Sequence, residues 1–338
     1  VGASNMYGHN PKDLKFRFQR VSPIHVSPHD PSIIYHTSQY VHKTTDEGKT
    51  WTIISPDLTA FEADKQVISG SPITRDITGE EFYSTIYAIR ESSVQQGVIW
   101  VGSNDGPVHV TQDGGNTWSN VTPKTLRPGG RVDAVEPSPH DPAQAYVSIL
   151  RYQLGDRKPY IYKTENFGKS WTLLTTGSNG VPADNPTRVV REDPVREGLL
   201  FAGTEYGMYV SLDDGKSWKS FQQNLPITPI TDLKVHRGDL AISTMGRSFW
   251  VLDNIETLRY GDYSKVDYPI LLPRTKTIRY RMPSGAYGSN RPNYPGPSVI
   301  MDYYLPKEDM PVQLEIRDDA DNIIAFTNDS TVTSPDPK

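Results

Sequence analysis

Hydrophobic and polar residues alternate over short stretches of this chain, and turn-forming residues separate the stretches at close intervals. The segments 98–111 (VIWVGSNDGPVHVT) and 199–211 (LLFAGTEYGMYVS) each hold two such stretches around a short turn with glycine. Alternation with a period of two, bounded by Gly, Pro, Asn and Asp, predicts antiparallel strands joined by tight turns. The chain contains 26 Gly and 28 Pro, which favours many short strands over long helices. We therefore expect an all-β fold.

An octapeptide with the pattern [ST]-x-[DN]-x-G-x-[TS]-W occurs four times, at 44–51, 111–118, 164–171 and 211–218. It contains four of the six tryptophans of the chain. Glycine allows the positive φ of a tight hairpin turn, and an Asp or Asn side chain accepts backbone N–H groups there. The Trp begins the outgoing strand, with its indole packed on a neighbour. The residues expected to build these turns are Asp46, Gly48 and Trp51; Asp113, Gly115 and Trp118; Asn166, Gly168 and Trp171; and Asp213, Gly215 and Trp218.

Each octapeptide is the last turn of a longer repeated unit. A Pro-rich turn, SPHDP, occurs at 27–31 and 138–142, and REDPVREG at 191–198 holds the same place in the fourth unit. Each unit reads as strand, Pro-rich turn, strand, short Gly turn, strand, octapeptide and strand. Four antiparallel strands in roughly 45–65 residues form a β-propeller blade. A fifth unit, 230–253, lacks the octapeptide and resembles a last blade.

The repeats divide the chain into four parts. Residues 1–15 form an N-terminal extension, and 16–258 form the propeller portion of about five blades. Residues 259–296 are rich in Pro, Gly and Tyr and are interpreted as a linker. Residues 297–338 alternate like the first strands of a β-sandwich domain, which needs about seven strands. The polar start at Val1, without an initiator methionine or a signal peptide, is expected of a fragment of a larger protein.

The composition argues against several classes of function. The net charge is −5 with no basic block, so we expect no nucleic-acid ligand, and no apolar run is long enough for a membrane span. The absence of cysteine excludes disulfides, thiolate metal sites and a cysteine nucleophile. His29 and His140 are expected to cap the SPHDP turns. The other histidines have no metal-ligand spacing, and no phosphate loop or nucleotide fingerprint is present, so we expect no metal and no cofactor.

The octapeptides and the segments around the last of them resemble the BNR or Asp-box superfamily. The closest match is to its sortilin-like (VPS10-type) and xyloglucanase-like bacterial members, and is carried by 203–218 (GTEYGMYVSLDDGKSW), 224–235 (NLPITPITDLKV) and 238–253 (GDLAISTMGRSFWVLD). The resemblance covers about residues 16–258. It implies structural octapeptides at the blade periphery, a secreted, periplasmic or cell-surface protein, and a ring with more blades than five. A closed ring of five blades remains the alternative.

The resemblance also indicates where an active site would lie. A glycosidase needs two carboxylates, one as the acid and one as the base or nucleophile. The xyloglucanase-like position matches Asn104 and Glu205, and Asp105 stands next to the first of these. A sialidase would need an arginine cluster and a tyrosine nucleophile. Arg188, Arg191 and Arg247 are candidates for that cluster. Arg247, in a turn before an apolar strand, is also the candidate for a ligand contact at the channel; the alternative is an ion pair between blades.

Three functions remain open at this point. The first is a non-catalytic binding or scaffold module that presents a loop face to a protein, peptide or glycan, favoured because no complete acid pair is found. The remainder of the polypeptide or a partner chain would complete its propeller. The second is a xyloglucanase-like glycoside hydrolase fragment, in which Glu205 and Asp105 are the weak catalytic candidates. The third is a structural subunit of an envelope assembly. Fold alone does not choose among them.

Overall fold

The computed structural model describes residues 8–68, 70, 82–261, 263, 266–272, 301–307 and 310–328. The chain divides into two compact units, Val1–Asp253 and Asn254–Lys338. The predicted extension 1–15 is described from residue 8 onward, where a 3₁₀ turn covers Pro11–Asp13.

The first unit consists of five antiparallel sheets that follow one another along the chain. Blade 1 contains β1 (Ile24–Val26), β2 (Ile34–Thr37), β3 (Val41–Thr44) and β4 (Thr52–Ile53). Blade 2 contains β5 (Ile86–Glu91), β6 (Ile99–Ser103), β7 (Val108–Thr111) and β8 (Ser119–Asn120). Blade 3 contains β9 (Arg131–Pro137), β10 (Ala145–Leu150), β11 (Ile161–Thr164) and β12 (Thr172–Leu173). Blade 4 contains β13 (Thr187–Glu192), β14 (Leu200–Thr204), β15 (Gly207–Ser211) and β16 (Lys219–Ser220). Blade 5 contains β17 (Ile230–His236), β18 (Asp239–Thr244) and β19 (Phe249–Leu252). Two further 3₁₀ turns, Ala63–Lys65 and Tyr152–Leu154, lie in connections.

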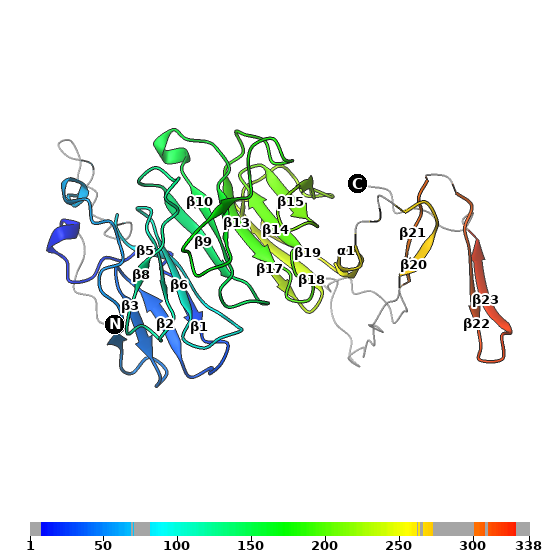
Figure 1. Ribbon diagram of the computed structural model, residues 1–338, viewed down its shortest axis with the longest axis horizontal. Helices are drawn as coiled ribbons and strands as arrows, with labels where there is room; N and C mark the ends of the chain where they lie inside the picture. The colour runs from blue at the N-terminus through cyan, green and yellow to red at the C-terminus, as the bar shows by residue number, and fades with distance from the viewer. Residues whose placement is uncertain are drawn as a thin grey trace, which may run out of the picture. The chain divides into compact units, whose positions relative to one another are not determined.

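The strands of each blade pair in sequence order, and the blades stack in sequence order as well. Figure 1 shows this progression from blue at blade 1 to yellow-green at blade 5. The first strand of each blade packs against the first strand of the next, from β1 through β5, β9 and β13 to β17. These five strands are called the inner strands below. The predicted all-β fold of four-stranded antiparallel propeller blades is confirmed.

Hydrophobic cores fill the spaces between consecutive blades. Tyr35 of blade 1 packs with Ile99 of blade 2, and Trp100 of blade 2 packs with Val147 of blade 3. The second strands β6, β10 and β14 are buried at every position, because a blade covers each of their faces. The second strands β2 and β18 are buried only at alternate positions or nearly so, which is typical of a sheet with one covered face. Blades 1 and 5 therefore each keep a less covered face.

The second unit contains a short helix and two separate strand pairs. Helix α1 covers Glu256–Arg259, β20 (Ile270–Leu272) pairs with β21 (Asp302–Tyr304), and β22 (Gln313–Arg317) pairs with β23 (Ile323–Asn328). Strand β20 lies in the stretch interpreted as a linker, and residues 273–296 of that stretch lie outside the described residues. The β-sandwich stays a prediction, since the described residues of this unit form only these two pairs. Among the described residues, no helix is long and apolar enough to cross a membrane.

Candidate functional site

The four octapeptides form hairpin turns whose polar side chains bond within the turn. In the first, Thr44 Oγ1 donates to Asp46 Oδ1 (2.8 Å) and accepts from Gly48 N (3.0 Å), while Asp46 Oδ1 accepts from Thr50 N (2.9 Å). Gly48 has a φ of 84°, which favours glycine. The hydrogen bonds from Thr50 hold the pKa of Asp46 at about 2. The carboxylate is thus fully used by its own turn.

The same bonding pattern recurs in the other three turns. Asp113 and Asp213 accept from the backbone N–H of the residue four positions later, each at 2.9 Å. Asn166 accepts from Ser170 N at 2.9 Å and donates from Nδ2 to Ser170 Oγ at 2.8 Å. The amide of Asn166 therefore replaces the carboxylate of the other turns. Its Nδ2 donates to the hydroxyl, whereas in the other turns the hydroxyl donates to the carboxylate.

The octapeptide tryptophans also join consecutive blades. Trp118, Trp171 and Trp218 donate from Nε1 to backbone carbonyls of the preceding blade, and the acceptors are Ile54 O (2.8 Å), Val121 O (2.6 Å) and Leu174 O (3.1 Å). Each acceptor lies three residues after the Trp of its own blade. Trp51, in blade 1, donates instead to Gly48 O of its own turn at 3.0 Å. Sequence alone predicted a packed indole but not this bond between blades.

Four inner strands carry an irregularity at the same place, and it brings polar side chains together. One extra residue bulges from each strand: Tyr87 in β5, Asp133 in β9, Arg188 in β13 and Thr231 in β17. The residue three positions later is charged in every case: Arg90, Glu136, Arg191 and Lys234. In a regular strand, residues three apart project to opposite faces, and a bulge shifts the alternation by one. The bulge residue and the charged residue three positions later therefore project to the same face. In β9, for example, Asp133 and Glu136 are both half-buried, while the residues on either side of them are buried.

Two of the bulge residues, Asp133 and Arg188, form a chain of ion pairs with Arg131 and with Glu205, which follows β14. Arg188 Nε contacts Glu205 Oε1 at 2.6 Å, and Arg188 Nη1 lies 3.7 Å from Asp133 Oδ2. Asp133 also pairs with Arg131, whose guanidinium lies 4.5 Å from the centre of the Tyr87 ring. Burial raises the pKa of the Asp133 carboxyl, while the Arg131 and Arg188 guanidiniums act in the opposite direction. Two carboxylates thus share two arginines.

The other catalytic candidate, Asp105, is buried and holds the backbone. Its Oδ2 accepts from Ala60 N (3.0 Å) and Phe61 N (3.3 Å), and its Oδ1 accepts from Ser103 Oγ (2.5 Å). Only 1% of its surface is exposed. Asn104 Oδ1 accepts from Thr85 N at 3.0 Å. The structure does not bring Asp105 into the network that holds Glu205.

Arg247 lies in the exposed hairpin between β18 and β19, which bonds to the residue before β17 through Met245 N and Pro229 O (2.9 Å). Its backbone N donates to Thr244 Oγ1 (3.1 Å), and its carbonyl accepts from Trp250 Nε1 (2.8 Å). Arg188 pairs with Asp133 and Glu205, whereas Arg191 pairs with Glu136 and Asp232, so these two arginines considered for a sialidase bind different carboxylates. Sequence reasoning missed Arg90, Glu136 and Lys234, although a charged residue three positions after another polar residue in an apolar strand was a usable signal.

The SPHDP histidines bond to the next blade. His29 Nε2 lies 2.8 Å from Ser92 O, and His140 Nε2 lies 2.8 Å from Asp193 O. Nε2 of each imidazole thus joins its own blade to the next one. No group of three or more potential metal ligands occurs in the part of the chain that the structure describes.

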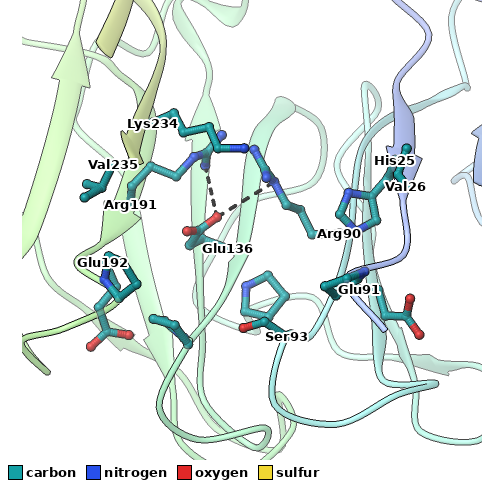
Figure 2. A pocket seen from close by; sticks show the side chains of 14 residues that line it. His25, Val26, Arg90, Glu91, Ser93, Glu136, Arg191, Glu192, Lys234 and Val235 are labelled. Carbon is teal, nitrogen blue, oxygen red and sulfur yellow. Dashed lines mark ion pairs between the residues drawn. The ribbon is translucent and has the colours of Figure 1, made fainter. Parts of the chain in front are cut away.

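The charged residues three positions after the bulges line a pocket of about 300 Å³, which we call the axial pocket. All five inner strands or the turns after them contribute to it, and it includes His25, Arg90, Glu136, Arg191 and Lys234 (Figure 2). Glu136 Oε2 lies 3.5 Å from Arg191 Nη1 and 3.8 Å from Arg90 Nε. Burial, aided by Arg90 and Lys234, lowers the pKa of His25 to about 4, so His25 is neutral at pH 7.

Two further carboxylates of the axial pocket are used by hairpins. Glu91 Oε1 accepts from Gly97 N at 2.8 Å, and Glu192 Oε1 accepts from Gly198 N at 3.0 Å. Figure 2 shows both carboxylates turned away from Glu136. The free polar surface of the pocket therefore comes from Arg90, Glu136 and Lys234.

No family model and no curated protein matches the chain. Among solved structures, the fold is similar to the GH74 xyloglucanase of Xanthomonas campestris, with a TM-score of 0.50 and 16% identity over 69% of this chain and 36% of that one. The GH74 enzyme of Niastella koreensis gives 0.49 and 16% identity over the same shares. YCF48 of Cyanidioschyzon merolae gives 0.47 and 14% identity over 67% of each chain. The chain thus spans about a third of the length of the two GH74 enzymes. At these identities the likeness shows the β-propeller fold alone.

Proposed function

We propose that this chain is the blade-forming part of a non-catalytic binding module, which presents the axial face of its inner strands to a protein, peptide or glycan. The observation that carries the proposal is the axial pocket, a polar concavity to which all five blades contribute. Concave sites with a few convergent polar groups are typical of ligand binding. The octapeptides support membership of the Asp-box superfamily, and with it a larger secreted, periplasmic or cell-surface protein.

The carboxylates near the axis support binding over catalysis. A glycosidase acid must hold a proton at the working pH, and its partner must act as base or nucleophile. Glu205 is held by Arg188, whose Nε lies 2.6 Å from Glu205 Oε1. Asp133 shares the same arginine. Neither group is free to approach a substrate without breaking the network.

Two measurements test this proposal together. The chain is screened against arrays of peptides and glycans, and xyloglucan incubated with it is assayed for reducing ends. We expect selective retention of a ligand and no release of reducing ends. Hydrolysis that is lost on Glu205→Gln or Asp133→Asn, and kept in the exposed control Glu197→Gln, would instead establish a hydrolase. Absence of any retained ligand in both arrays contradicts the binding function.

We also propose that blade 1 packs against a further blade, supplied by the remainder of the polypeptide or by a partner chain. Ile24 and Val26 of β1 are 70% and 48% exposed, which is costly for apolar side chains on an inner strand. Every other octapeptide Trp bonds to the blade before it, and Trp51 bonds within its own turn. Blade 5 has no fourth strand among the described residues. Neither this blade 5 nor that of a second copy of the chain therefore supplies the carbonyl that Trp51 would need.

Hydrogen exchange distinguishes this open arrangement from a closed ring of five blades. In the chain alone, we expect fast exchange of the amides of 24–26 and slow exchange in β10. In the longer natural protein, or with the partner, exchange of 24–26 should slow by at least tenfold. Slow exchange of 24–26 in the chain alone would mean that blade 5 closes on blade 1.

A further inference from the structure

Two cations of the axial pocket, Arg90 and Lys234, make no side-chain hydrogen bond within the described residues. Arg191 is fixed, because it donates to Leu233 O at 3.1 Å and to Asp232 Oδ1 at 2.7 Å. Arg90 has a single partner among the described residues, Glu136, at 3.8 Å, which is beyond hydrogen-bonding distance. Lys234 is exposed and has no hydrogen bond or ion pair within the described residues. Glu136 and Asp232 are the carboxylates within 4 Å of these cations, and neither accepts a hydrogen bond from Arg90 or Lys234 within the described residues.

The unused donors of this pocket belong to Arg90 and Lys234. A guanidinium offers five N–H donors and an ammonium three, and Arg90 and Lys234 use none of them for hydrogen bonds within the described residues. The charge of Arg191 lowers the pKa of Arg90, a sign that the two guanidiniums repel each other across the pocket. A second carboxylate between Arg90 and Lys234 would relieve that repulsion and accept charge-assisted hydrogen bonds.

The rim of the pocket is apolar and lacks aromatic platforms. Prolines of the turns that follow the inner strands, with two valines, surround the charged floor: Pro28, Pro137, Pro139, Pro194, Val26 and Val235. No Trp, Tyr or Phe is among the residues that line it. An aliphatic rim around a cationic floor matches a Glu or Asp side chain flanked by apolar residues. A sugar ring would lack an aromatic face to pack on.

We propose that the axial pocket binds an acidic peptide segment, with a carboxylate held between Arg90 and Lys234 and the flanking apolar residues on the proline rim. This inference rests on the proposed binding function and adds the class of ligand to it. Arg191 acts as a fixed cation that holds Glu136 in place. Glu136 in turn separates the two guanidiniums, so that Arg90 stays directed at the ligand.

The test uses a fluorescent peptide with blocked ends, in which three Glu alternate with Leu and Pro, and its Gln counterpart. Binding to the whole chain is followed by fluorescence anisotropy at low and high salt. Arg90→Gln and Lys234→Gln are each expected to weaken binding of the Glu peptide roughly tenfold, which corresponds to about 1.4 kcal/mol. Lys216→Gln, on the exposed turn of the last octapeptide, is the matched control and should change nothing. Circular dichroism checks that each variant is folded.

The outcomes separate the ligand class from the function itself. Equal binding of the Glu and Gln peptides, or equal weakening by Lys216→Gln, overturns the assignment of this pocket. Displacement of the peptide by oligogalacturonate but not by a second acidic peptide would assign the pocket to an acidic glycan instead. No binding of the Glu peptide at millimolar concentration also overturns the inference. The binding function itself fails only when the wider peptide and glycan arrays are empty as well.

Discussion

Replacing an octapeptide glycine with alanine tests how closely its turn approaches the preceding blade, because the cost in stability depends on what the new Cβ meets. Gly48 and Gly168 have nearly the same φ, 84° and 78°, in the same kind of turn. A Cβ on Gly48 would meet only the ring of Trp51, at 3.5 Å. A Cβ on Gly168 would lie 2.5 Å from Cβ of Val121 in blade 2. The two substitutions therefore share the backbone strain and differ in the contact between blades.

The expected magnitudes follow from these distances. A positive φ costs a residue with a Cβ about 1–2 kcal/mol, so Gly48→Ala should lower the free energy of unfolding by about that amount. Gly168→Ala adds overpacking against Val121, which costs about 1–3 kcal/mol more. Val121→Ala keeps the Cβ of Val121 but removes its two methyl groups, which the new Cβ would meet at 2.8 and 2.9 Å, and this should recover part of the cost. We expect the double variant Gly168→Ala with Val121→Ala to be more stable than the sum of the single changes predicts, by about 1 kcal/mol or more.

Equilibrium unfolding in urea, followed by tryptophan fluorescence and circular dichroism, provides these free energies. The control pair is Gly48→Ala with Val121→Ala, which lie in different turns and should be additive. Equal costs for the two glycines would refute the reasoning, because it would mean that the third octapeptide does not rest on blade 2. A non-additive control pair would show that the substitutions act through something other than the contact.

Three further predictions follow from the same contacts. Thr164→Val keeps the shape of the side chain but removes the acceptor of Gly168 N (2.9 Å), so it should cost about 1–3 kcal/mol of unfolding free energy in urea. Trp118→Phe removes a bond between blades and should cost about 1–3 kcal/mol, whereas Trp51→Phe should cost less; an equal cost in thermal unfolding would contradict the role of the indole N–H in blade packing. His42 is 1% exposed and burial lowers its pKa to about 4, so the unfolded chain binds a proton that the folded chain does not. The contribution of His42 to stability should therefore be intact above pH 6.5 and fall by about 1.4 kcal/mol per pH unit as the pH decreases toward 4. Burial also lowers the pKa of His25 and His109 to about 4, so these residues add to the slope of the whole chain, and His42→Gln should reduce that slope by about 1.4 kcal/mol per pH unit in urea unfolding at pH 7, 6 and 5.

Much of the fold was determined by local sequence. The strands follow from alternation and from the placement of Gly and Pro, and each octapeptide contains its own acceptor, its glycine and its hydroxyl. These contacts span no more than about four residues, so the pattern of the chain is sufficient to predict them. The repeat then predicted blades, because four short strands with regular turns can bury their faces only by stacking on further sheets of the same kind.

The site was decided by tertiary structure. Arg90, Glu136, Arg191 and Lys234 come from four blades, and their approach depends on how the sheets stack and on one bulge in each of the four inner strands that carry them. The bulge shifts the alternation of side chains by one residue. A regular period of two therefore assigns the residues that follow the bulge to the wrong face of the strand. Likewise, Asp133 of blade 3 meets Arg188 of blade 4 only because the two blades pack together. Local sequence encodes the turn and the blade, whereas contacts between residues about 50 positions apart depend on packing energies summed over whole blades, and these only the folded molecule specifies.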